Sequence, residues 1–159
     1  MTASESIHAH AAHPAVRTAA MVFGVVFLLV GILGFIPGIT TNYDQLGAAG
    51  HMSEAMLLGV FQVSILHNIV HLLFGIAGVA LARSAMGAKN FLVWGGVVYL
   101  ALWIYGLVID QESVANFVPM NTADNWLHFV LGVAMVAVGL LLTSGRRRGE
   151  GRGHRTAHP

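Results

Sequence analysis

Two short stretches of this sequence combine histidine and asparagine with a further ionisable residue at helical spacing. The stretches are HNIVH at 67–71 and DNWLH at 124–128. Residues four apart lie on one face of a helix, one turn from each other. Each stretch therefore predicts two side chains that can bind a metal or a hydrogen-bond partner from the same helix face. Their polar members are His67, Asn68, His71, Asp124, Asn125 and His128.

Several kinds of chemistry fit these residue types. Three imidazoles and one carboxylate suit zinc, iron or another divalent metal, and the candidate ligands are His67, His71, Asp124 and His128. Haem ligation by His71 and His128, or a proton relay through the histidines, uses the same set. In the remaining interpretation the imidazoles hydrogen-bond with Asn68 and Asn125, because each of these side chains offers both a donor and an acceptor. We favour this structural network, and the metal or haem site is the alternative.

The elements that position these residues are predicted to be membrane helices. Of the 159 residues, 56% are hydrophobic and only 9% are charged, and the mean hydropathy is +0.72. A soluble domain is about a quarter charged. The chain contains no cysteine, which excludes disulfides, thiolate metal sites and cysteine nucleophiles.

Four apolar segments approach the roughly 20 residues that a membrane-spanning helix needs. They cover 18–36, 64–82, 91–109 and 124–143. We expect an all-α polytopic membrane domain over 18–143, and Ser53 with Glu54 suggests that the second helix begins before its span. The long connection that follows the first span is interpreted as an ordinary solvated loop rather than a lid over the polar residues.

The distribution of positive charge predicts the orientation. Arg17 precedes the first span, Arg83 and Lys89 lie between the second and third, and an arginine-rich tail follows the fourth, whereas the connections 37–54 and 110–123 contain neither Lys nor Arg. Cytoplasmic segments carry the excess of Lys and Arg. The histidine-containing tail 1–17 and the basic tail 144–159 are therefore expected in the cytoplasm, where the basic tail meets anionic lipid headgroups rather than nucleic acid.

The two halves of the chain resemble each other. Residues 24–34 and 96–106 are identical at six of eleven positions, and 67–75 matches 124–132 in the pattern [H/D]-N-x-x-H-x-x-x-G. Two repeated helical hairpins in the same orientation are predicted. Small residues continue the polar stripe of the second and fourth spans, so we expect these two helices to pack stripe against stripe.

Three stretches, GFIPGITTNYDQL, LLGVFQVSILHNIVHLLFGIAGVALAR and NTADNWLHFVLGVAMVAVGLL, carry a resemblance to a known family. The chain closely resembles the four-helix membrane proteins of domain of unknown function 4383, found mainly in actinobacteria. The resemblance implies a bacterial inner-membrane (plasma-membrane) protein and supplies no activity, cofactor or protein partner. We therefore expect a non-enzymatic integral membrane component, with a metal- or haem-binding redox or transport component as the alternative.

Overall fold

A computed structural model describes the backbone of residues 3–153 and the side chains of residues 14–143. The described chain is mainly helical, as expected, and its helices are α1 (Ala3–Leu33), α2 (Ile65–Leu81), α3 (Ala85–Val108) and α4 (Thr122–Gly153). The histidines at 8–13 and the arginines from 146 onward lie outside the residues whose side chains are described.

Three segments within the described chain are long and apolar enough to cross a membrane, namely Pro14–Leu33, Ala85–Val108 and Thr122–Thr143. The chain is therefore a membrane protein by the length and composition of its helices. The predicted second span, 64–82, corresponds to α2, an apolar helix of only 17 residues. At 1.5 Å per residue α2 covers roughly 25 Å, against a bilayer core of about 30 Å.

Serine caps set where two of the helices begin. Ser64 accepts a hydrogen bond from the His67 N–H at 3.1 Å, so α2 begins after Ser64. The prediction that Ser53 starts this helix is wrong, because the Ser53 hydroxyl instead donates to the Val63 carbonyl at 2.6 Å. Ser84 caps α3 through the Gly87 N–H, so α3 begins six residues before the predicted Phe91.

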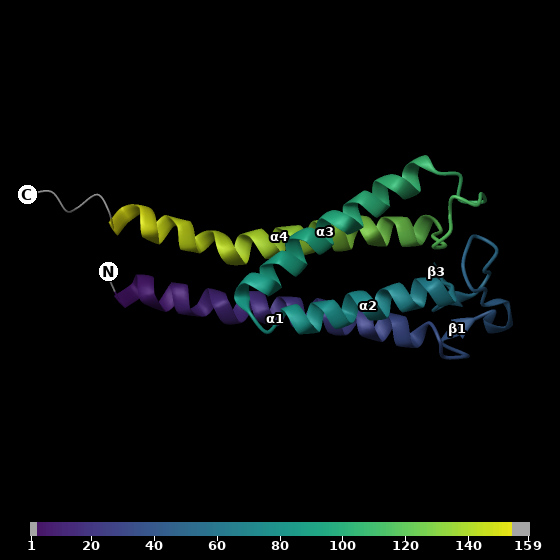
Figure 1. Ribbon diagram of the computed structural model, residues 1–159, viewed down its shortest axis with the longest axis horizontal. Coiled ribbons are helices and arrows are strands. Elements are labelled where there is room, and N and C mark those ends of the chain that lie inside the picture. Colours follow the sequence, from purple (N-terminus) through teal and green to yellow (C-terminus); the bar gives the residue numbers. More distant parts are fainter. Residues whose placement is uncertain (1–2, 154–159) are drawn as a thin grey trace, which may run out of the picture.

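The helices form two pairs that lie side by side, α1 with α2 and α3 with α4 (Figure 1). The long connection (residues 34–64) and the short connection (residues 109–121) lie at the same end of the molecule, and the α2–α3 turn lies toward the other end. This arrangement places all six polar residues named above at the end that carries the two connections.

The long connection folds into a small three-stranded sheet that the sequence did not predict. Its strands β1 (Thr40–Thr41), β2 (Met56–Leu57) and β3 (Phe61–Gln62) are antiparallel in that order, and a 3-10 helix, η1 (Tyr43–Gln45), follows β1. Ala55, Leu57 and Val63 are buried against the end of α1. Part of this connection is therefore a packed cap on the helices.

Glycines allow close approach within each helix pair. A Cβ on Gly75 would meet Gly24 and Leu28 of α1, and a Cβ on Gly132 would meet the backbone of Gly96 in α3. The predicted packing of the α2 stripe on the α4 stripe is therefore wrong below the histidines, where each stripe packs against the helix of its own pair. Close backbone contact gives this arrangement its van der Waals attraction.

Candidate functional site

The polar cluster (His67, Asn68, His71, Asp124, Asn125 and His128) brings residues of α2 and α4 together at the connection end. The His67 and His71 rings are 4.7 Å apart between centroids, and the His67 and His128 rings are 6.5 Å apart. His67 and His128 are buried, and His71 is half-buried. The structure thus places the three predicted imidazoles close to one another across two helices.

Two aromatic residues that sequence reasoning did not select complete the wall beside the histidines. Tyr99 meets the His128 ring edge-on at 5.1 Å, and Phe27 stacks on Tyr99 at 5.2 Å and lies 6.1 Å from the His71 ring. Phe27 and Tyr99 occupy equivalent positions in the similar segments 24–34 and 96–106. Their equivalent positions in the two similar segments were the sequence signal for these two residues. Aromatic residues are common in apolar helices, so this signal did not single them out.

Asp124 makes defined hydrogen bonds with the backbone. Its Oδ2 atom accepts the N–H of Gln62 in β3 at 2.9 Å and the N–H of Asn121 at 3.0 Å. The Asn121 side chain returns a bond by accepting the Asp124 N–H at 3.0 Å. This reciprocal pattern caps the start of α4 and joins it to the sheet of the long connection.

The interpretation of the long connection as an ordinary solvated loop is therefore wrong for its final part. Besides the bond from Gln62 to Asp124, the Asn121 amide donates to the Val60 carbonyl at 2.8 Å. The Gly50 N–H donates to the Phe117 carbonyl of the short connection at 2.7 Å. These contacts bind the two connections to each other directly above the polar cluster.

Each asparagine of the cluster faces a glycine of its own helix pair: Asn68 faces Gly34, directly after the end of α1, and Asn125 faces Gly106 in α3. A Cβ on Gly34 would collide with the Asn68 amide, and a Cβ on Gly106 would collide with the Asn125 amide. Both asparagines are buried. Because glycine has no side chain, Gly34 and Gly106 leave room for the two asparagine amides. Asn68 is thereby held between α2 and the chain at Gly34, and Asn125 is held between α4 and α3.

Several buried polar atoms of the cluster have no hydrogen-bond partner among the described residues. They are Nδ1 of His67, Nδ1 of His128, Nδ2 of Asn68 and Oδ1 of Asn125. His71 differs, because its Nδ1 lies 3.2 Å from the His67 carbonyl. Buried polar groups normally have partners, so these four atoms are exceptions within the cluster.

The hydrogen bonds that Asp124 and His71 make run to the backbone, and among the described residues none joins a histidine of the cluster to Asn68 or Asn125, as the predicted network required. Within residues 14–143, no group of three or more His, Cys, Asp or Glu side chains is arranged to hold a metal ion. One oxygen of Asp124 already accepts two backbone N–H groups.

A family model described as a domain of unknown function (DUF4383) matches residues 17–141. The chain belongs to this family. The matched region contains the whole polar cluster and both connections. No curated protein and no solved structure matches the chain.

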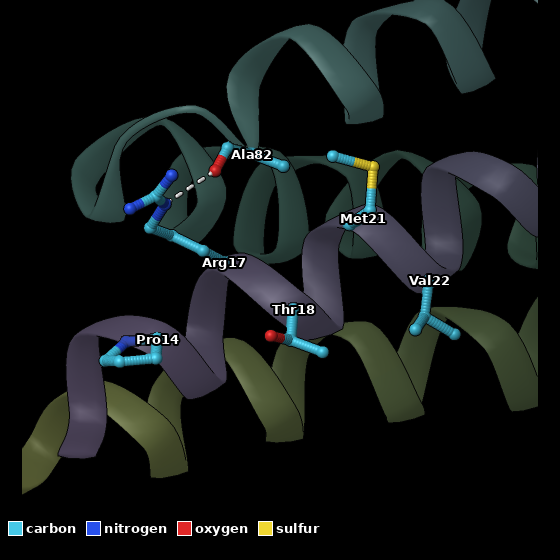
Figure 2. A pocket seen from close by; sticks show the side chains of 6 residues that line it. All are labelled: Pro14, Arg17, Thr18, Met21, Val22 and Ala82. Atoms are coloured by element: carbon cyan, nitrogen blue, oxygen red, sulfur yellow. Dashed lines mark hydrogen bonds between the residues drawn. The ribbon is translucent and has the colours of Figure 1, made fainter.

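Arg17, the first residue of the matched DUF4383 region, marks the other end of the helices. Its Nε atom donates to the Ala82 carbonyl at the end of α2, at 3.0 Å (Figure 2). The guanidinium borders an open pocket of about 330 Å³, lined by Pro14, Arg17, Thr18, Met21, Val22 and Ala82. A cation beside the carbonyl end of a helix is stabilised by the helix dipole, so Arg17 joins α1 to α2 at this end.

Proposed function

We propose that the chain is a non-enzymatic, multi-pass protein of the bacterial inner membrane whose polar cluster is a structural network at the outer surface. The observation that carries this proposal is the double acceptor role of Asp124, which ties α4 to β3. A carboxylate that satisfies two backbone N–H groups serves the fold, because either group would otherwise lack a partner.

The distribution of charge supports an orientation with both termini in the cytoplasm. The connections at the polar-cluster end contain Asp44, Glu54, Asp110 and Glu112 but neither Lys nor Arg. Arg83 and Lys89 lie at or near the opposite turn. On the positive-inside rule the polar cluster faces the outside of the cell. The basic tail 144–159 then lies beside anionic headgroups of the inner leaflet.

Equivalent contacts in the two helix pairs support an origin from a repeated hairpin. Ser64 accepts from the N–H three residues later, and Asn121 does the same at the start of α4. Gly34 opposite Asn68 corresponds to Gly106 opposite Asn125. We propose that the halves are copies whose shared Gly–Asn contact holds each hairpin together at its outer end.

Elemental analysis tests the structural role of the cluster. The protein is purified in detergent without a histidine tag, beside a His71→Ala/His128→Ala variant. The structural network predicts less than about 0.1 metal ion per chain in both samples. It also predicts that the variant unfolds at a lower denaturant concentration than the unaltered chain, because a buried network has been truncated. Near-stoichiometric metal in the unaltered chain alone would refute it.

A metal- or haem-binding redox or transport component is the second candidate, and the unpartnered Nδ1 atoms of His67 and His128 favour it. Neutral imidazole nitrogens are common metal ligands. In that case the histidines bind the metal or haem without Asp124, because Oδ2 of Asp124 accepts two backbone N–H groups. An absorbance spectrum of the same sample separates the two ligands, because haem gives a strong Soret band and zinc gives none.

A further inference from the structure

The turn between β2 and β3 holds a leucine in a backbone conformation that suits glycine or asparagine. The Val60 N–H donates to the Leu57 carbonyl at 3.1 Å, which closes a four-residue turn. Its central residues, Leu58 and Gly59, have φ angles of 55° and 70°. Positive φ at both positions is the property of a type I′ turn, in which the first central residue is usually Asn, Asp or Gly.

Leu58 does not gain packing within the protein in return for this conformation. Its side chain is 63% exposed, and Val60 on the other side of the turn is 46% exposed. The Leu58 N–H donates to the Ile39 carbonyl at 2.9 Å, so the backbone is held while the side chain projects outward. Residues in such backbone conformations persist only where the surrounding structure holds them, and they are common at functional sites.

The position of the turn indicates what the exposed side chains meet. The Val60 carbonyl accepts from Asn121, the residue directly before the apolar span Thr122–Thr143. One turn into that helix, Trp126 is 51% exposed and its ring lies 6.2 Å from Trp103 and 5.9 Å from Phe129. Tryptophan gathers at the boundary between lipid and water, so the turn lies at the depth where the membrane begins.

We propose that the β2–β3 turn is a membrane anchor that inserts Leu58 and Val60 into the phospholipid interface of the outer leaflet. This inference rests on the proposed membrane location. The turn between Met56 and Gln62 contains no charged residue, so no side chain there opposes entry into the headgroup–acyl boundary. Apolar side chains that enter this boundary leave water, and their burial holds the cap against the membrane surface.

Site-specific labelling tests the anchor, because the chain contains no cysteine. A single Leu58→Cys substitution is labelled with an environment-sensitive nitrobenzoxadiazole dye, and the protein is reconstituted into phosphatidylcholine–phosphatidylglycerol nanodiscs. Quenching is measured with a lipid that carries a nitroxide near its headgroup and, separately, with aqueous cobalt. Leu73→Cys in α2, where Leu73 is 62% exposed, serves as the lipid control, and Glu112→Cys in the short connection serves as the water control.

The anchor predicts that the dye at position 58 is quenched by the lipid nitroxide at least about three times more strongly than the dye at 112. It also predicts weaker quenching by cobalt at 58 than at 112. If position 73 is quenched by lipid but position 58 behaves like 112, the anchor is wrong and the membrane location stands. If position 73 is also quenched only by cobalt, the membrane location itself fails. Shielding of position 58 from both quenchers would show a protein contact and would likewise refute the anchor.

Discussion

Replacement of Asp124 by alanine should destabilise the protein substantially. The substitution leaves the N–H groups of Gln62 and Asn121, at 2.9 and 3.0 Å from Oδ2, without their acceptor. An unsatisfied buried donor costs about 1–3 kcal/mol, and both bonds are part-buried, so we take the lower part of that range for each. The expected loss is about 2–4 kcal/mol, or about 30- to 1,000-fold in the unfolding equilibrium constant.

Unfolding in mixed micelles of increasing dodecyl sulfate, followed by tryptophan fluorescence, measures this loss. Asp124→Asn keeps a side-chain acceptor and should lose about 1 kcal/mol at most. Asp110→Ala is the matched control, because Asp110 accepts the Glu112 N–H at 3.0 Å from an exposed site. If Asp124→Ala costs no more than Asp110→Ala, the carboxylate does not hold the cap to α4 and the reasoning fails.

Four further substitutions follow from the contacts described above and use the same unfolding measurement. Gly34→Ala and Gly106→Ala should each cost about 1–3 kcal/mol because the new methyl group collides with a buried asparagine amide, and costs below 0.5 kcal/mol would contradict the fit. Leu58→Asn should stabilise the detergent-solubilised protein by about 1 kcal/mol, since asparagine tolerates positive φ, and destabilisation would argue against the strained turn. Arg17→Met should cost about 0.3–1 kcal/mol by removing the cation at the end of α2. An unchanged unfolding midpoint would show that the hydrogen bond from Arg17 to the Ala82 carbonyl does not contribute to stability.

The helical part of the fold was accessible from the sequence because long apolar segments have few alternatives in a bilayer. Three of the four predicted spans correspond to helices of spanning length. The small sheet was not accessible, because its strands are two residues long and carry no alternating pattern. The start of α2 was misplaced because Ser53 and Ser64 both look like caps, and only tertiary contact shows that Ser53 bonds to Val63.

The histidines of the site were found from their spacing alone, since i and i+4 residues must share a helix face. The contacts that neighbouring residues make with the site could not be predicted in this way. The bond from Gln62 to Asp124 joins residues 62 positions apart, and no local pattern predicts such a contact. The stripe of small residues was read correctly as a packing surface but assigned to the wrong neighbour, because glycine spacing does not say which helix approaches.

Cysteine labelling in intact bacterial cells tests most directly whether the chain spans the membrane with the polar cluster outside. Glu54→Cys and Glu112→Cys place single thiols in the two connections, and Met86→Cys places one near the α2–α3 turn, all at exposed positions. The account predicts that a membrane-impermeant maleimide labels positions 54 and 112 in intact cells and labels position 86 only after permeabilisation. Labelling of position 86 in intact cells, with 54 and 112 protected, would contradict it.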